Sequence, residues 1–240
     1  MACSENEYML ENQITTITFF HFKGLHAIWM FPQMQLSLSG FKDIDGLSFF
    51  KLMGSGGKRG FSILPNLNTY AFMGVWDSEA QALNFFNHAK QFQKFTQHAN
   101  EHCTILMHNV KAHGSWSGAN PFGNFQKYDG GLIAVITRAT IKPKFISKFW
   151  RYVPQVSDNI HEHDGLLFSI GIGEYPLMMQ ATFSIWKDQA FMKAYAYKSP
   201  LHREVIKKTR ELGWYQEELF SNFIPYQTIG TWKGENILDL

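Results

Sequence analysis

The second half of this 240-residue chain repeats the first, and no other feature of the sequence constrains the fold as strongly. Similar segments recur in the same order along the chain. The pairs are 45–49 with 164–168, 75–76 with 185–186, and 114–118 with 230–234. The last pair reads Gly-Ser-Trp-Ser-Gly and then Gly-Thr-Trp-Lys-Gly. A common order with small differences in spacing indicates duplication followed by loop insertion.

Hydrophobic periodicity predicts the order strand, helix, strand, strand, helix, strand in each half. The predicted strands are 15–22, 47–53, 69–75, 103–110, 132–138, 166–172, 178–186 and 220–228, and the predicted helices are 25–38, 79–99, 143–160 and a broken helix over 188–212. This order is the ferredoxin-like unit, whose helices cover one face of its sheet and leave the other apolar. The sequence therefore predicts an α+β fold, in which two tandem ferredoxin-like βαββαβ repeats form a dimeric-α/β-barrel-like domain within one chain.

The repeat also divides the chain. We expect a disordered tail over 1–13, a first repeat over 14–118, a linker over 119–130, a second repeat over 131–234 and a C-terminal tail over 235–240. The first half carries additional residues around a glycine-rich segment, 54–60. This segment lacks the spacing of a phosphate loop or a dinucleotide fingerprint, because Leu52 and Arg59 stand where glycines are required. We interpret it as a mobile loop over a pocket.

Composition excludes several classes of protein. A net charge of +2 without a block of Lys and Arg gives no footprint for nucleic acid. The cysteines, Cys3 and Cys103, form neither a disulfide framework nor a thiolate metal cluster, which favours a reducing cytoplasm. No stretch approaches the roughly 20 apolar residues that span a bilayer. The 22 Phe, 9 Tyr, 7 Trp and 10 Met fit either a rich core or an apolar channel for a greasy substrate.

The halves differ most at a helix that Ser199-Pro200 is predicted to begin and Gly213 to end. One face of this helix is predicted to carry His202, Val205, Ile206, Thr209 and Leu212. The counterpart of His202 in the first half is Phe92. The positive end of the helix dipole disfavours imidazolium and keeps a lone pair free for a metal. The alternative is a core histidine bonded to a backbone carbonyl, and the residues alone leave both open.

Other candidates are weaker. Glu217 and Glu218 are adjacent, and we interpret them as surface charges near the end of an element. No Gly-x-Ser-x-Gly elbow supports nucleophilic hydrolysis, and no Cys/His set has zinc-site spacing. Polar residues that interrupt apolar strands are better candidates for a pocket, although purely structural hydrogen bonds explain them equally well. They are Lys51, Arg138, Glu174, Gln180 and Ser184.

Long motifs in this chain resemble those of a known family. They include Phe-Trp-Arg-Tyr-Val-Pro at 149–154, Gly-Ile-Gly-Glu at 171–174 and Gly-Trp-Tyr at 213–215, together with segments 49–56, 137–143, 180–186 and 202–206. The sequence resembles the spheroidene monooxygenases, also called acyclic carotenoid 2-ketolases, from about Thr18 to Gly234. Two positions depart from the family pattern, since His113 stands where Arg is expected and Ser169 where Lys is expected.

The resemblance implies an oxidoreductase that uses haem b and dioxygen to introduce a keto group at C-2 of an acyclic carotenoid, by successive hydroxylation. It also implies that His202 is the axial iron ligand, with Val205, Ile206 and Thr209 beside the cofactor. The polar residues of the strands then become candidate catalytic groups. An electron donor such as a ferredoxin is implied, and the family leaves open a homo-oligomer and a place at the periphery of the inner membrane.

Two alternatives to ketolation remain at this point. One is a haem barrel with other chemistry, such as peroxide or chlorite turnover or aldoxime dehydration, because a fold does not determine a function. The other is a non-catalytic carrier that binds haem or another hydrophobic ligand.

Overall fold

The structure is a computed structural model that describes residues 13–57, 64–151, 160–161, 163–198, 209 and 211–239. The expected N-terminal tail, apart from Gln13, lies outside these residues. So do the end of the glycine-rich segment, most of the second part of the helix predicted over 143–160, and His202 with Val205 and Ile206.

The first half forms the predicted order of elements, with one difference in its second helical region. Its elements are β1 (Ile14–His21), α2 (Leu25–Leu36), a 3-10 turn η1 (Leu38–Phe41), β2 (Leu47–Gly56), β3 (Pro65–Trp76), α3 (Glu79–His88), α4 (Lys90–His98) and β4 (Glu101–Gly114). The single helix predicted over 79–99 is wrong. Ala89 adopts an extended backbone and separates α3 from α4. Apolar periodicity continues across the break because both helices pack on the same sheet face.

The second half repeats this order as far as the structure describes it. Its elements are β5 (Ile133–Ile141), η2 (Pro143–Phe145), β6 (Leu166–Tyr175), β7 (Met179–Trp186), α6 (Gln189–Lys198) and β8 (Tyr215–Gly230). Residues 146–151, which follow η2, are helical. No helix in the described ranges is long and apolar enough to cross a membrane.

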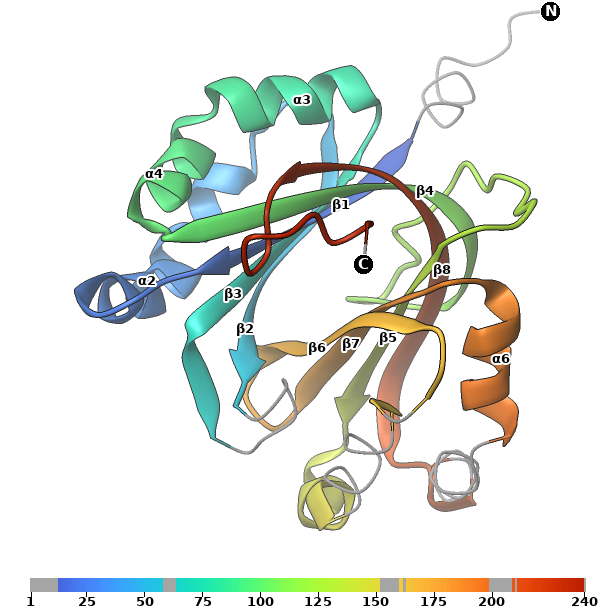
Figure 1. Cartoon of the computed structure of the whole chain (residues 1–240). Coiled ribbons are helices and arrows are strands. Elements are labelled where there is room, and N and C mark those ends of the chain that lie inside the picture. The colour runs from blue at the N-terminus through green and yellow to red at the C-terminus, as the bar shows by residue number, and fades with distance from the viewer. Residues whose placement is uncertain are drawn as a thin grey trace, which may run out of the picture.

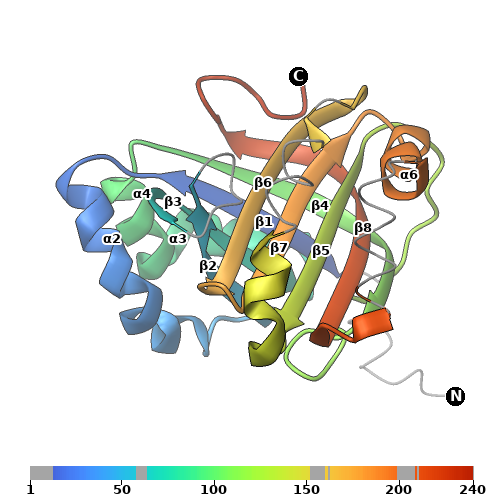
Figure 2. The ribbon, with the colours of Figure 1, turned by 90° about the horizontal axis from the view of Figure 1, so that it is seen from below.

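The strands close into one antiparallel barrel with the order β1-β3-β2-β6-β7-β5-β8-β4 (Figures 1 and 2). Each half contributes a sheet with the ferredoxin-like order, which confirms the predicted fold class. The halves meet along two unequal seams. The seam between β4 and β8 is long, from Cys103 opposite Gly230 to Gly114 opposite Leu219. The seam between β2 and β6 consists of Gly54 opposite Gly173 and Ser55 opposite Ile172.

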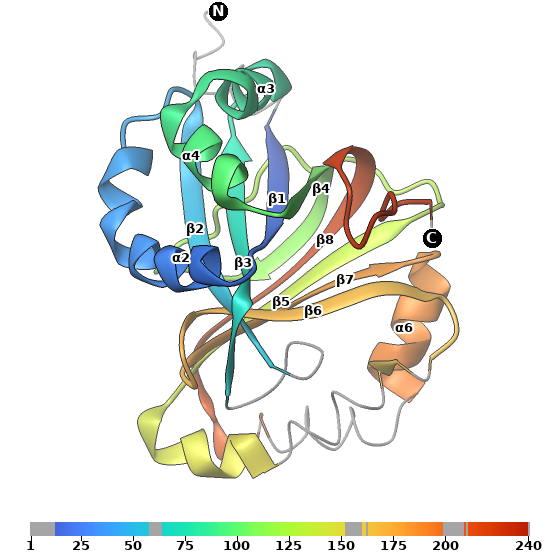
Figure 3. The same ribbon diagram turned by 60° about the vertical axis from the view of Figure 1, so that its left-hand side comes forward.

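Apolar side chains from every strand fill the interior of the barrel, with Ile17, Ile105, Ile136 and Phe183 among those with no exposed surface. A second, strongly aromatic cluster lies outside the barrel, between the first-half sheet and α2, α3 and α4. Both faces of this part of the wall are therefore buried. Figure 3 shows these three helices together on one side of the barrel.

The repeated Gly-x-Trp-x-Gly segments form the same turn in both halves. Gly114 and Gly230 have φ of 93° and 86°, a region that favours glycine, and a Cβ at either would collide with a backbone carbonyl of the neighbouring strand. Each tryptophan then forms a matching backbone bridge, Trp116 with Ala119 and Trp232 with Glu235. The duplication read from the sequence is thus also present in the backbone.

Candidate functional site

The polar residues predicted for a pocket divide between the two faces of the barrel wall. Successive side chains of a strand lie on opposite sides of the wall, so residues two apart share a side. By this spacing the inward side that carries Met53, Ile136 and Ile172 also carries Lys51, Arg138 and Glu174. Gln180 and Ser184 lie on β7, where Ala181, Phe183 and Ile185 take the inward positions. These two residues therefore lie on the outer face. The five candidates do not form one constellation.

The three inward candidates join a fourth residue in one group of ion pairs, which we call the charged cluster: Lys51, Arg138, Glu174 and Glu217. The ammonium nitrogen of Lys51 lies 2.6 Å from Glu174 Oε2, and Arg138 Nη2 lies 3.6 Å from Glu174 Oε1. Arg138 also donates a hydrogen bond to Glu217. The Arg138 side chain is 2% exposed, so its charge is stabilised by these carboxylates rather than by water.

Neutral donors complete the charged cluster. The indole Nε1 of Trp116 donates to Glu174 Oε1 at 2.6 Å, and Lys51 also donates to the Ser117 hydroxyl at 2.7 Å. The guanidinium of Arg138 lies 5.6 Å from the centre of a Trp116 ring. The turn that follows β4 in the first half therefore contacts charges that the second half supplies. We infer that the cluster joins the two halves beside their short seam.

The structure corrects the interpretation of Glu217 as a surface charge, whereas Glu218 is exposed as expected. The Glu217 carboxylate accepts hydrogen bonds from the Gly118 amide at 2.7 Å and from the Ser115 hydroxyl at 3.0 Å. Glu101 holds the second-half turn in the same way, through the Gly234 amide at 2.7 Å and the Thr231 hydroxyl at 3.0 Å. The sequence signal for this role was the repeated turn. In both cases the turn is held by a glutamate at the start of the partner strand, Glu217 in β8 for the first turn and Glu101 in β4 for the second.

Arg138 distinguishes the end of the barrel near the Glu217 turn from the end near the Glu101 turn. Its counterpart in the first half is Phe19, because each is the sixth residue of an equivalent strand whose pairing begins opposite a tryptophan. Phe19 packs against Phe168 and Trp232 with ring centres 5.4 and 5.8 Å apart. One end of the barrel interior is therefore aromatic and the other is charged.

The pKa of Glu217 is lowered in the folded protein. Burial alone would raise it, but hydrogen bonds from the Gly118 amide, Arg138 and Ser115, together with the positive charge of Arg138, favour the carboxylate. A lowered folded pKa means that Glu217 stabilises the fold fully above the ordinary glutamate value of about 4.3. This stabilisation is lost as the pH falls through the lower folded value.

We therefore expect the difference in unfolding free energy between wild type and Glu217→Gln to be largest near neutral pH and to shrink below about pH 4. Urea unfolding at a series of pH values measures this difference. Glu235→Gln is the matched control, because Glu235 is exposed and has no charged partner among the described residues. A difference that stays constant down to the acid limit would contradict the assignment.

The outer face of the second-half sheet lacks the bulk of its first-half counterpart. Strand pairing places Gly171, Thr182 and Thr137 in one row, and Leu52, Phe72 and Thr18 in the equivalent row. We use the name outer strip for the positions of this second-half face where the side chain is smaller than its first-half counterpart. They are Ala139, Ser169, Gly171, Gln180 and Thr182, and they stand where the first half has Phe20, Phe50, Leu52, Tyr70 and Phe72.

The packing around the outer strip follows from this loss. Buried apolar residues on this side form two separate clusters, one around Trp186 and Met192 and one around Phe149 and Trp214. Figure 3 shows α6 and the helical residues 146–151 beneath opposite ends of the sheet. Thr137, in the middle of β5, is exposed between them. Among the described residues, none fills the centre of this face.

Polar atoms near the outer strip agree with this arrangement. The Ser169 hydroxyl and the Asn222 side-chain oxygen are buried and have no hydrogen-bond partner in the described part of the chain. Ser184 accepts from the Trp186 indole at 2.9 Å, and Gln180 donates to the Tyr175 carbonyl at 3.3 Å. Ser169 is also one of the two departures from the family pattern. The other, His113, is exposed on β4.

Thr209 is the one predicted cofactor residue that the structure describes. It is half-buried, and its carbonyl accepts from the Gly213 amide at 2.9 Å. Its side chain hydrogen-bonds to Tyr215, whose pKa is raised because burial outweighs that bond. No group of His, Cys, Asp and Glu that could hold a metal by itself occurs in the described ranges.

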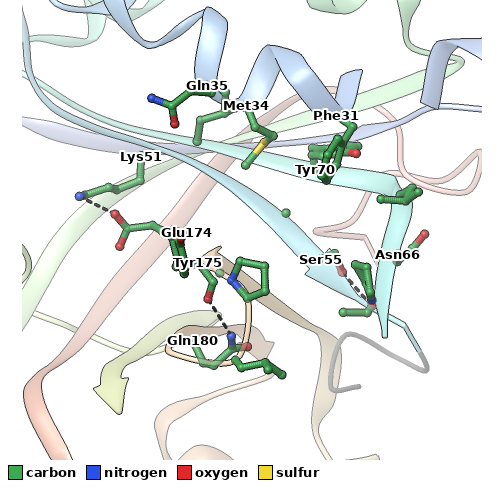
Figure 4. Close-up of a pocket in the computed structure, with 18 of the residues that line it drawn as sticks. Phe31, Met34, Gln35, Lys51, Ser55, Asn66, Tyr70, Glu174, Tyr175 and Gln180 are labelled. Atoms are coloured by element: carbon green, nitrogen blue, oxygen red, sulfur yellow. Dashed lines mark hydrogen bonds and ion pairs between the residues drawn. The ribbon is translucent and has the colours of Figure 1, made fainter. Parts of the chain in front are cut away.

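A pocket of about 620 Å³ lies outside the barrel over the short seam (Figure 4). Residues from α2, the β2–β3 hairpin and the β6–β7 turn line it, including Phe31, Leu67, Tyr70 and Tyr175. Gln180 of the outer strip is also part of its lining. The pocket therefore adjoins the outer strip along the same face of the wall.

Comparison with known proteins decides the family. The chain is 36% identical over 229 residues to the spheroidene monooxygenase of Rhodobacter capsulatus, covering 94% of this chain and 95% of that protein. It is 34% identical to the spheroidene monooxygenase of Cereibacter sphaeroides, with coverage of 93% and 70%. The chain belongs to the spheroidene monooxygenase family. The matched relatives are named monooxygenases, a class of oxidoreductase, which confirms the resemblance read from the motifs.

The fold extends to more distant proteins. An aldoxime dehydratase structure aligns with a TM-score of 0.64 at 10% identity and covers 99% of this chain and 89% of the other. A second, in complex with butyraldoxime, aligns with a TM-score of 0.65 at 9% identity, with coverage of 96% and 86%. At such identities the likeness shows a shared fold alone. No family model matches the sequence.

Proposed function

We propose that this chain is a haem-dependent and oxygen-dependent monooxygenase that introduces a keto group at C-2 of an acyclic carotenoid or a similarly long apolar molecule. The family relatives carry spheroidene in their names, which supports the substrate class. The outer strip is the observation that supports the cofactor part of the proposal. The duplicated fold allows the outer face of the first-half sheet, which apolar side chains fill, to be compared with the outer face of the second-half sheet, whose centre no described residue fills.

The residues present fit haem b. A planar group needs a flat wall with small side chains, and the outer strip offers Ala139, Gly171 and Thr182 where the first half packs Phe20, Leu52 and Phe72. The buried Ser169 hydroxyl and Asn222 side-chain oxygen, which have no hydrogen-bond partner among the described residues, could bond to a bound group. We propose that His202 would hold the haem iron, with Val205, Ile206 and Thr209 contributing to the binding of the cofactor.

Bound haem would supply the activation of dioxygen. Each hydroxylation consumes one O₂, two electrons and two protons, and it releases one water while a C–H bond becomes C–OH. A second hydroxylation at the same carbon gives a geminal diol, which loses water to form the ketone. The electrons would come from a donor such as a ferredoxin.

The chain's own residues orient the substrate and exclude water. Trp150, Tyr175 and Gln180 line the pocket, and Gln180 also belongs to the outer strip, so a long apolar molecule in the pocket could extend toward the cofactor. The charged cluster lies on the inner side of the wall, and two of its members, Lys51 and Glu174, also contribute to the pocket lining (Figure 4). We assign Lys51, Arg138 and Glu174 to holding the two halves in register, and Gln180 and Ser184 to the outer face where the reaction would occur.

The proposed function is tested with purified protein reconstituted with haemin. We expect a Soret band, and a keto product at C-2 when an acyclic carotenoid, dioxygen and a reducing system are added. His202→Ala should shift or abolish the Soret band, and added imidazole should restore it. Protein that stays colourless would overturn the haem assignment, whereas haem binding without carotenoid turnover would favour a carrier or another haem chemistry.

A further inference from the structure

The helix α2 is apolar on both sides, yet one side is exposed. Ala27 and Met30 face the sheet and are buried. Leu25, Ile28, Phe31 and Leu36 are 81%, 65%, 61% and 69% exposed. A helix that is apolar all round is typically buried within protein or lipid. The exposed side of α2 therefore suits an apolar medium rather than water.

The exposed residues continue around the mouth of the pocket. Phe31, Leu67 and Tyr175 all line it, and they are also 61%, 40% and 63% exposed. Figure 4 shows Phe31 and Met34 of α2 on one side of the pocket and Tyr175 on the other. These residues, with Leu25, Ile28 and Leu36, make one surface that we call the α2 face. Contiguous exposed apolar surface of this kind marks an interaction site.

The charge around the α2 face fits a lipid surface. The helix contains no Asp or Glu, exposed Lys23 precedes it, and exposed Lys42 follows it, next to exposed Asp43. Basic residues that border an apolar helix face are typical of helices that lie in the interface of anionic membranes. A second copy of this chain, docked through the same face, would bring like charges together and cover both pocket mouths.

The pocket itself is suited to receive an apolar ligand. The hydroxyl of Tyr70, a residue that lines the pocket and is 2% exposed, has no hydrogen-bond partner within the described residues. Burial raises the pKa of Tyr70 to about 12, so the hydroxyl stays protonated and can donate. A long apolar molecule with one acceptor oxygen would satisfy it.

We propose that the α2 face docks onto an anionic lipid bilayer and that the pocket behind it is the portal through which the apolar substrate leaves the lipid. The inference rests on the proposed function only for the identity of the substrate. A lipid-soluble molecule could then pass from the bilayer to the outer strip without crossing water.

Vesicle flotation tests the docking. The protein, without substrate, is mixed with vesicles of phosphatidylcholine and phosphatidylglycerol or of phosphatidylcholine alone. We expect wild type to float with the anionic vesicles, and Ile28→Glu and Phe31→Glu each to weaken binding roughly tenfold or more. Phe125→Glu is the matched control, because Phe125 is 51% exposed, lies in the segment between β4 and β5, and belongs neither to the α2 face nor to the pocket lining.

The outcomes separate the docking from the reaction. Loss of turnover with vesicle-embedded carotenoid, but not with detergent-solubilised carotenoid, in Ile28→Glu, which is on the α2 face but not in the pocket lining, would support the portal. Wild type that does not bind vesicles, or a dimer that the same substitutions dissociate, would overturn it. Vesicle binding by a protein that makes no keto product would support the docking while contradicting the proposed function.

Discussion

Thr182→Phe should weaken haem binding by roughly 100-fold, equivalent to about 3 kcal/mol. The substitution restores at this position the side chain that Phe72 contributes in the first half, where it packs against Phe41 and Phe85. A ring at position 182 would occupy the centre of the outer strip and displace a planar cofactor. Haemin titration followed at the Soret band measures the affinity.

The control for this experiment is Gln227→Phe, which adds the same ring at an exposed position of β8 outside the outer strip. Circular dichroism and thermal unfolding without haem establish that both variants fold. If Thr182→Phe binds haemin as tightly as Gln227→Phe, then the cofactor does not lie against the outer strip.

Arg138→Ala should lower the free energy of unfolding by about 3–5 kcal/mol. The substitution leaves the Glu174 and Glu217 carboxylates without the buried cation that both contact. It also removes the stacking of the guanidinium on Trp116. Denaturant unfolding of the variant and of wild type gives the difference directly.

Lys127→Ala is the control for Arg138. Lys127 pairs with Asp129 at 2.8 Å, but the two side chains are 86% and 73% exposed, so the pair should contribute at most about 1 kcal/mol. A loss below that value in Arg138→Ala would mean that the charged cluster is effectively solvated. It would then not serve to join the halves.

The architecture could be predicted from the sequence because the duplication supplied two readings of each element. The Gly-x-Trp-x-Gly turn is an example, since its glycines are required by the same backbone geometry at Gly114 and Gly230. The break at Ala89 could not be predicted, because apolar residues keep their spacing across it and no proline or glycine marks it.

The site was less accessible to sequence reasoning. Polar residues within apolar strands led to Lys51, Arg138 and Glu174, which the structure brings together, and by the same criterion to Gln180 and Ser184, which lie on the opposite face. Both faces of the wall carry buried apolar residues, the barrel interior on one side and helix-packed clusters on the other, so hydrophobic alternation does not reveal which side is inward. Glu217 was misread because its partner Arg138 lies 79 residues away in the chain.

The unequal seams set where the barrel is weakest. Between β2 and β6 the backbone pairing is confined to Gly54 and Ser55 with their partners, whereas β4 and β8 are paired over most of their length. Local opening events therefore favour the β2–β6 side, where the charged cluster rather than extensive backbone pairing holds the two sheets. Such a breathing motion would widen the pocket over this seam while the two sheets stay tethered along their opposite margin, so a rigid, rod-shaped guest could enter the pocket without unfolding of the barrel.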